Sequence, residues 1–290
     1  MLPKNFLIIG GDRRQAYAAN TLCKSGDGKI FAAAIPKELL DKEIIISDDI
    51  IAAISISDYI VLPIEKSADA KTVHTPLVSC DIKMEEIAAA ARKGTLITGG
   101  RVSQRTREIF AKRGHEIQDY LKREELAVLN AIPTAEGALM LALRESGTTI
   151  WGSKVLIAGF GRVGKACARL FIAMGADVTV LARSHEDLAW AKLYGAGAVS
   201  LKSRGVDCKN SEIIINTIPT MIFDREALSE LKKGTVIIDL ASVPGGVDLD
   251  SAEDFGINAT LALSLPGKVA PVTSGEIIAQ TILNIISEMR

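Results

Sequence analysis

A glycine-rich turn between a buried strand and a helix constrains the fold of this chain most strongly. From Lys154 to Lys165 the chain reads KVLIAGFGRVGK, which places G-x-G-x-x-G directly after an apolar run. In such a turn Gly159 lets the chain leave the strand sharply, Gly161 lets the backbone approach a pyrophosphate, and Gly164 lets helix and strand pack closely. The anion lies on the free N–H groups of the helix that follows. We therefore predict a dinucleotide-binding turn, against the alternative of a βα turn without a ligand, and assign its cofactor contacts to Gly159, Phe160, Gly161, Arg162, Val163 and Gly164.

The next strand indicates which dinucleotide is bound. A site for NAD places Asp or Glu at the end of this strand to accept from the ribose 2′-hydroxyl. Here the strand ends in Ala182 and is followed by Arg183 and Ser184. A guanidinium and a hydroxyl can bind a 2′-phosphate, so we predict NADP in preference to NAD. The alternatives are that Arg183 is a solvated charge and that Ser184 only caps the next helix.

Composition excludes several classes of protein. The chain has 290 residues, 48% hydrophobic and 24% charged, with a formal net charge of −1. This predicts a two-domain globular protein with neither a nucleic-acid surface nor a membrane anchor. An N-terminus without a signal-peptide core favours the cytoplasm. The four cysteines and three histidines are scattered, so we expect no metal site, and we expect no histidine at a strand-end loop.

The pattern of apolar runs predicts an α/β protein of two domains. Residues 1–130 alternate short strands with helices, which is typical of a parallel sheet. Residues 131–290 are expected to form a Rossmann-type, doubly wound sheet. A helix over 134–145, capped by Thr134, is predicted to link the domains. A last helix over 274–289, opened by a capping box at Thr273, is predicted to pack back on the first domain.

Three loops after the later strands of the second domain are expected to face the nicotinamide end of the cofactor. Ligands of doubly wound sheets lie outside the carboxyl ends of the strands. Small and proline-containing segments follow the strands that end near residues 216, 240 and 262. The predicted cofactor contacts in these loops are Thr217, Ile218, Pro219, Asp239, Ala241, Leu263, Ser264 and Leu265.

Few charged residues are candidates for the chemistry. Arg13 and Arg14 follow Gly10-Gly11-Asp12 at the end of the first strand, where they could bind a carboxylate or only begin a helix. Glu136 is predicted in the first turn of the linking helix, where it could be a catalytic group or only complement the helix dipole. Lys268 is predicted in a loop, where it could hold an anion or stabilise a developing charge.

Four segments together resemble the dipicolinate synthase family of endospore-forming bacteria, specifically its A subunit. They are Gly10 to Arg13, Leu129 to Ala138 (LNAIPTAEGA), the GFGRVG turn at Gly159, and Leu265 to Pro271 (LPGKVAP). The resemblance covers essentially the whole chain. It implies oxidation of dihydrodipicolinate to pyridine-2,6-dicarboxylate with NADP⁺ during sporulation, in the cytoplasm of the mother cell. It also implies a flavoprotein-like B subunit as partner, and a homo-oligomer is a further possibility.

A dicarboxylate substrate fits the residues above. It needs at least two cationic or N–H-rich anchors, for which Arg13, Arg14, Lys268 and the helix start at Thr134 are the candidates. Our hypothesis is that Arg13 and Lys268 hold carboxylates and that Glu136 or a water accepts the proton. Two other functions remain open: a dehydrogenase of 2-oxo or 2-hydroxy acids, and a nucleotide-binding subunit whose partner performs the chemistry.

Overall fold

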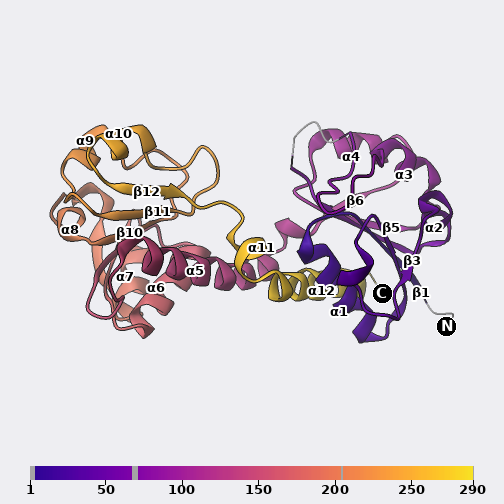
Figure 1. Ribbon diagram of the computed structural model, residues 1–290, viewed down its shortest axis with the longest axis horizontal. Helices are drawn as coiled ribbons and strands as arrows, with labels where there is room; N and C mark the ends of the chain where they lie inside the picture. The colour runs from indigo at the N-terminus through magenta and orange to yellow at the C-terminus, as the bar shows by residue number, and fades with distance from the viewer. Residues whose placement is uncertain (1–3, 67–70, 204, 290) are drawn as a thin grey trace. The chain divides into compact units, whose positions relative to one another are not determined.

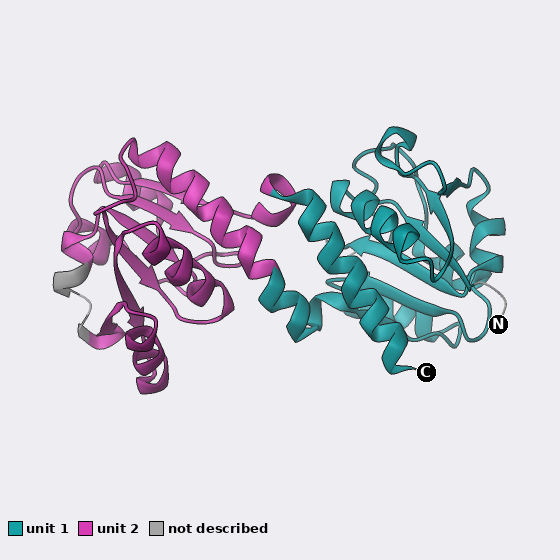
Figure 2. Ribbon diagram, turned by 90° about the horizontal axis from the view of Figure 1, so that it is seen from below, with its two compact units in different colours: residues 1–129, 270–290 teal, residues 130–269 magenta. Residues whose placement is uncertain are grey.

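The computed structural model describes residues 4–66, 71–203 and 205–289. The chain forms two compact units (Figure 2). Unit 1 contains residues 1–129 together with 270–290, and unit 2 contains residues 130–269. The two chain crossings lie within or next to helices, at Leu129 in α5 (Glu124–Ser146) and at Ala270, which precedes α12 (Pro271–Glu288).

Unit 1 is built on a parallel six-stranded sheet in the order β3-β2-β1-β4-β5-β6. Its strands are β1 (Lys4–Ile9), β2 (Gly28–Ala33), β3 (Ile45–Ile46), β4 (Tyr59–Ile64), β5 (Leu96–Gly100) and β6 (Ile117–Asp119). Its helices are α1 (Arg13–Ser25), α2 (Ile50–Ile56), α3 (Met84–Ala90), α4 (Gln104–Ala111) and the C-terminal α12. Short 3₁₀ turns occupy Lys37–Leu39 and Tyr120–Lys122.

The alternation of side chains along β1 builds two cores in unit 1. Phe6 and Ile8 point to the face that α1 and α12 cover, and Leu7 and Ile9 point to the opposite face, which packs against α2, α3 and α4. All four side chains are at most 1% exposed. A parallel strand buried on both faces reads as a continuous apolar run, as this strand does.

Helix α12 lies beside α1 although the two are at opposite ends of the chain (Figure 1). The helices come close because Gly275 has no side chain. A Cβ on Gly275 would lie 2.6 Å from both the Arg14 carbonyl oxygen and the Tyr17 Cβ. The predicted capping box at Thr273 is wrong: the helix begins earlier, with Pro271 in its first turn, and the Ser274 hydroxyl donates to the Ala270 carbonyl at 2.8 Å.

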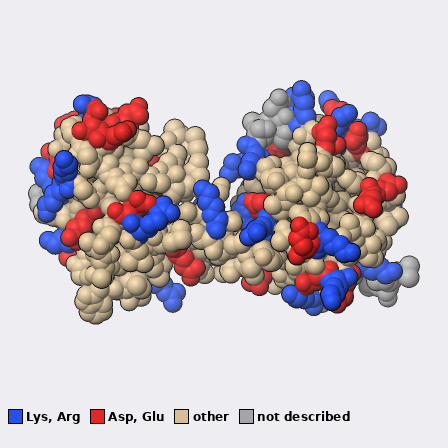
Figure 3. Space-filling model, in the orientation of Figure 1, with Lys and Arg blue, Asp and Glu red and all other residues tan. Residues whose placement is uncertain are grey.

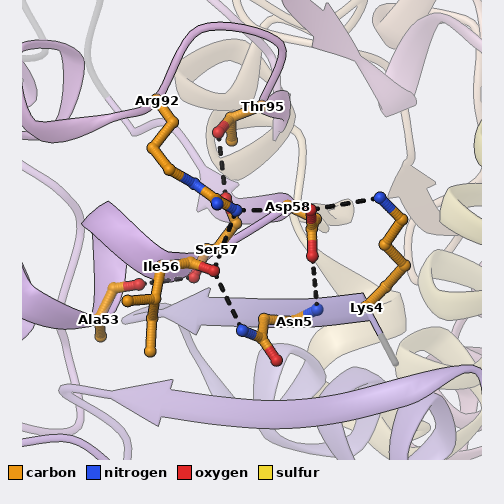
Figure 4. Close-up of polar contacts among 8 residues, drawn as sticks. All are labelled: Lys4, Asn5, Ala53, Ile56, Ser57, Asp58, Arg92 and Thr95. Atoms are coloured by element: carbon orange, nitrogen blue, oxygen red, sulfur yellow. Dashed lines mark hydrogen bonds and ion pairs between the residues drawn. The ribbon is translucent and has the colours of Figure 1, made fainter. Parts of the chain in front are cut away.

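A carboxylate joins the starts of the central strands at the amino edge of the unit 1 sheet (Figure 4). Asp58 accepts from the Asn5 backbone N–H at 2.9 Å, from Lys4 Nζ at 3.3 Å and from Arg92 Nη2 at 3.4 Å. Burial alone would raise the pKa of Asp58, but these donors and cations hold it below its ordinary value. This network stabilises the strand starts and lies at the edge opposite to the strand ends discussed below.

Unit 2 repeats the strand order of unit 1, since its parallel sheet runs β12-β11-β10-β7-β8-β9. This confirms the predicted α/β fold with a Rossmann-type second sheet. Its strands are β7 (Lys154–Ala158), β8 (Asp177–Ala182), β9 (Gly197–Ser200), β10 (Ile213–Asn216), β11 (Val236–Asp239) and β12 (Asn258–Leu261). Its helices are α6 (Arg162–Ala173), α7 (His185–Leu193), α8 (Gly205–Asn210), α9 (Arg225–Ser229), α10 (Leu249–Asp254) and α11 (Leu265–Val269), with a 3₁₀ turn at Leu201–Ser203.

Helix α5 corrects the predicted linker. It begins at Glu124, not at residue 134, and Pro133 lies inside it. Thr134 is therefore not an N-cap; its hydroxyl donates to the Asn130 carbonyl at 2.8 Å, one turn back. Among the helices that the structure describes, α5 is long and apolar enough to cross a membrane by length and composition. Its small residues, Ala138 and Ala142 among them, pack in the core of unit 2, which accounts for part of that apolar character.

We expect Gly275→Ala to destabilise unit 1. The added methyl group overlaps backbone atoms of α1, which cannot rotate away, so the free energy of unfolding falls by about 1–3 kcal/mol despite the better helix propensity of alanine. Urea unfolding followed by circular dichroism measures the change. Glu276→Ala, at the exposed neighbouring position, should change stability by less than about 0.5 kcal/mol. A Gly275→Ala protein as stable as the wild type would contradict the close packing of α1 and α12.

Candidate functional site

The turn from β7 into α6 has the geometry that a dinucleotide requires. Gly159 has φ +93°, which other residues rarely adopt, and a Cβ there would overlap Thr217 Oγ1. Gly164 packs against the Gly159 carbonyl so closely that a Cβ would overlap its oxygen. Gly161 is different, because a Cβ built on it meets no atom within 4 Å. The second glycine thus faces open space at the start of α6, where a pyrophosphate would approach the backbone N–H groups.

The turn lies at the point where the chain changes direction across the sheet. Strand β7 has β10 on one side and β8 on the other, so the connections leaving β7 and β10 go to opposite sides. In open α/β sheets a crevice forms outside the carboxyl ends of two such strands. The residues at these ends in unit 2 can hold a nicotinamide dinucleotide, which supplies a hydride acceptor when bound.

A buried carboxylate–amide pair fixes the loops after β10 and β11. Asp239 is 2% exposed, and it accepts from Asn216 Nδ2 at 2.8 Å, the Ala241 N–H at 3.0 Å and the Gly246 N–H at 2.7 Å. Asn216 in turn accepts from the Ile218 N–H at 3.0 Å. The side chain of Asp239 is fully engaged inside the protein. Any part it has in cofactor binding therefore acts through the position of these loops.

The other predicted contacts after β10 and β11 differ in accessibility. Thr217 is half-buried and donates to the Ala158 carbonyl at 2.9 Å, which ties β10 to the glycine turn. Ile218 is half-buried and Pro219 is exposed, whereas Ala241 is buried. Phe160 is also buried, so Phe160 and Ala241 present mainly backbone groups.

The end of β8 agrees with the sequence in part. Ala182 is buried, and Arg183 and Ser184 are exposed at the surface. Ser184 is the N-cap of α7: its hydroxyl accepts from the Asp187 N–H at 3.0 Å and lies 2.8 Å from the Asp187 carboxylate. The capping alternative for Ser184 is thus confirmed, and binding of a phosphate by this hydroxyl stays a prediction. Arg183 forms no ion pair or hydrogen bond with the residues that the structure describes.

A cation–aromatic cluster beside the turn was not predicted from the sequence. Lys165, one residue past the last glycine, has its ammonium 5.6 Å from the Trp190 ring centroid and 5.8 Å from that of Phe160. Such contacts position a cation at about 0.5–2 kcal/mol each. The spacing of α6 and α7 in the sequence contains no signal for this contact, because it depends on how the two helices pack.

Two predicted catalytic residues lie in elements other than those expected. Glu136 is exposed in the middle of α5, so the predicted first-turn position is wrong. Lys268 is exposed in the short helix α11, where a loop was predicted. Leu265 is buried at the start of α11 and packs against Gly137 of α5, where a Cβ would lie 3.0 Å from it. Leu263 and Ser264 are exposed before α11, and Ser264 has φ +59°.

In unit 1 the structure separates the two adjacent arginines. Arg14 is 15% exposed and forms a bidentate pair with Asp12, with Nε 3.0 Å from Oδ1 and Nη2 2.7 Å from Oδ2. Burial alone would raise the pKa of Asp12, but the hydrogen bond and charge of Arg14 bring it below its ordinary value. Asp12 is also the N-cap of α1. Arg13 is exposed and makes no polar side-chain contact within the described part of the chain.

One histidine lies at a strand end, contrary to the sequence-based expectation. The His74 carbonyl accepts from the Gly11 N–H at 2.7 Å, which fixes this residue at the end of β1. Its Nε2 atom is buried and has no hydrogen-bond partner among the described residues. No repeat or motif around His74 could have indicated this, because the contact joins distant segments of the chain.

These features define a class: a two-domain oxidoreductase whose second domain is of the Rossmann dehydrogenase type. Residues 5–121 match the family described as the N-terminal domain of the dipicolinate synthase A subunit, and residues 134–244 match the NAD-binding domain of D-isomer specific 2-hydroxyacid dehydrogenases. The dipicolinate synthase A subunit of Bacillus subtilis (strain 168) is 36% identical over 234 residues, which are 80% of this chain and 79% of that protein. The chain belongs to the family of dipicolinate synthase A subunits.

Solved structures agree with this assignment. The crystal structure of the dipicolinate synthase A subunit from Bacillus halodurans superimposes with a TM-score of 0.88 at 32% identity, covering 99% of this chain and 98% of that one. The corresponding A chain from Bacillus subtilis also gives 0.88 at 32% identity, covering 100% and 97%.

We expect Asp239→Asn to destabilise unit 2 and weaken dinucleotide binding together. The amide NH₂ group cannot accept from the Ala241 or Gly246 N–H, so a buried donor loses its partner at about 1–3 kcal/mol. Thermal unfolding with and without NADPH measures both effects. Asp177→Asn, which alters an exposed carboxyl group at the start of β8, is the matched control and should leave both unchanged. Normal stability of Asp239→Asn would show that this carboxylate does not hold the two loops.

Proposed function

We propose that this chain oxidises dihydrodipicolinate to pyridine-2,6-dicarboxylate with NADP⁺ as hydride acceptor. The observation that carries the proposal is the intact glycine turn, with open space at Gly161, in a chain of this family. Aromatisation of the ring favours the reaction, so its main requirement of the protein is to position the ring against the nicotinamide.

The cofactor preference rests on the end of β8. Ala182 leaves no carboxylate to accept from a ribose 2′-hydroxyl or to repel a 2′-phosphate, and the exposed Arg183 is a suitable phosphate ligand. Lys165 adds a second cation near the same turn, held by the Trp190 and Phe160 rings. These features support NADP over NAD.

The substrate carboxylates require cations. We propose Arg13, Arg14 and Lys268 as their ligands. Arg14 has the firmest support, because Asp12 holds one edge of its guanidinium and Nη1 has no acceptor among the described residues. Thr134 is not included, since it does not begin a helix and so offers no free N–H groups to an anion.

The name of the relatives supports a partner protein. As the A subunit of a synthase, the chain is proposed to act with a B subunit, which we expect to be flavoprotein-like, in the cytoplasm of sporulating cells. Basic and acidic side chains both occur on each unit (Figure 3), in keeping with a formal net charge of −1.

Arg183→Ala should weaken NADPH binding by about 10- to 100-fold, because a charged hydrogen bond contributes roughly 1.5–3 kcal/mol. Its effect on NADH should be less than about threefold. Fluorescence titration with both nucleotides measures the two dissociation constants. Arg169→Ala, at an exposed position on α6, serves as the control for a general loss of positive charge. Tighter binding of NADH than NADPH by the wild type would refute the NADP assignment.

The purified chain should form NADPH from freshly prepared dihydrodipicolinate, as measured by absorbance at the nicotinamide band. Arg14→Ala and Lys268→Ala should each lower kcat/KM by about 10- to 100-fold, since each removes a charged anchor. The reaction is run with and without the B subunit. Activity that requires the B subunit, and is independent of nucleotide binding by this chain, would assign the chemistry to the partner.

A further inference from the structure

Unit 1 has a direction change of its own at the carboxyl edge of its sheet. In the order β3-β2-β1-β4-β5-β6, strand β1 lies between β2 and β4, so the connections leaving β1 and β4 go to opposite sides. Ligands of doubly wound sheets bind at such points. The proposed dinucleotide occupies the equivalent point of unit 2, whereas the proposed function leaves the one in unit 1 without a ligand.

The chain brings three groups to this point. Asp12 and Arg14 follow β1 directly, and Lys66 follows β4. The segment that contains His74 is held there by two backbone hydrogen bonds, from the Gly11 N–H to the His74 carbonyl at 2.7 Å and from the Val73 N–H to the Ile82 carbonyl at 2.8 Å. The absence of a side chain at Gly10 makes room for this segment, since a Cβ there would lie 2.8 Å from Thr75 Cγ2.

The imidazole of His74 is the unusual member of this group. Its Nε2 atom is shielded from water and lacks a hydrogen-bond partner among the described residues. Leaving such an atom unpaired costs about 1–3 kcal/mol, and such atoms are rare in native proteins without a functional reason. The charges that act on the ring are those of Lys66, Asp12 and Arg14, so the ring belongs to the same cluster.

Arg14 supplies an anion ligand beside this ring. Asp12 occupies Nε and one side of Nη2, and no described residue accepts from Nη1. A guanidinium held along one edge presents its other edge as a pre-organised donor pair for a carboxylate. Gln15, the next residue, is fully buried and donates to the Val61 carbonyl at 3.1 Å, which fixes the first turn of α1 against β4.

We infer that the direction change of unit 1 is the substrate site, where Arg14 binds one ring carboxylate and His74 Nε2 accepts the proton lost in the oxidation. This inference rests on the proposed function. The substrate ring gives a hydride from one saturated carbon to the oxidised nicotinamide and a proton from the neighbouring carbon to His74. The two electrons of the second C–H bond complete the aromatic ring, and the imidazolium then releases its proton to solvent.

The surroundings of His74 suit a proton acceptor. Burial lowers the pKa of His74, with Lys66 and Arg14 acting in the same direction and Asp12 opposing them, so the ring is neutral at pH 7. Asp12 is the poorer base of the cluster, because both of its oxygens accept from Arg14 and its pKa lies below the ordinary value. Glu136, the acceptor suggested by the sequence, is an exposed side chain on α5 in the structure.

The kinetic test compares His74→Gln with Glu136→Gln and with His115→Gln as the matched control. We expect His74→Gln to lower kcat/KM by about 100-fold or more, the contribution of a general base, while the dissociation constant of NADPH stays unchanged. The wild-type kcat/KM should fall at acid pH as His74 is protonated, below its ordinary pKa of 6.5, and His74→Gln should lose this acid limb. A normal rate in His74→Gln, or a comparable loss in Glu136→Gln, overturns the assignment.

A binding test needs neither turnover nor a variant that folds. The three histidines can be resolved by NMR in protein labelled at the imidazole Cε1 position. Saturation with pyridine-2,6-dicarboxylate should move the His74 signal and raise its pKa, because nearby carboxylates favour the imidazolium, and should leave His115 unchanged. If the dicarboxylate binds and His74 does not respond, the site is elsewhere and the inference fails.

The two tests separate this inference from the proposed function. A wild-type protein that binds the dicarboxylate at His74 but forms no NADPH refutes the proposed oxidation by this chain alone and retains the site. A wild-type protein that forms NADPH, with no response at His74 in either test, keeps the function and refutes the site. Failure to bind the dicarboxylate at any concentration refutes both.

Discussion

The contact between the Gly159 carbonyl and Gly164 is the constraint on which the nucleotide-binding half of this protein depends. It holds the start of α6 directly over the end of β7, and it leaves no room for any side chain at either position. Because the helix cannot move away from the strand, its first N–H groups point to the carboxyl edge of the sheet. Asp239 and Asn216 then fix the two neighbouring loops around that edge through hydrogen bonds inside the protein.

The two units show how one strand order can be used for two different ligands. In unit 2 the residue before α6 is Gly161, which offers no side chain to the helix N-terminus. In unit 1 the equivalent residue before α1 is Asp12, whose carboxylate accepts from the Arg14 N–H. A carboxylate at this position takes the place of a phosphate and repels it. Unit 1 therefore offers a guanidinium to an anion where unit 2 offers backbone N–H groups.

The sequence predicted the parts of the structure that are local. The glycine turn, the strand over residues 213–216 and the cap at Ser184 each depend on a few adjacent residues. Pro133 led to a wrong helix boundary, because proline is typical of a helix start. Here the packing of Ala131, Ala135 and Ala138 keeps it inside α5 at the expense of a backbone hydrogen bond. His74 and the Lys165–Trp190 contact could not be predicted, because each joins segments that only the tertiary fold brings together.

The return of the chain to unit 1 has a consequence for the arginine that we assign to the substrate. Helix α12 contacts α1 at Gly275, against the backbone of Arg14 itself. The guanidinium of Arg14 is thus fixed at both ends, by Asp12 at its tip and by the packed helix at its backbone. A cation positioned in this way loses little side-chain entropy when it binds an anion. The closest packing in unit 1 therefore lies next to the residue whose position matters most for binding a carboxylate.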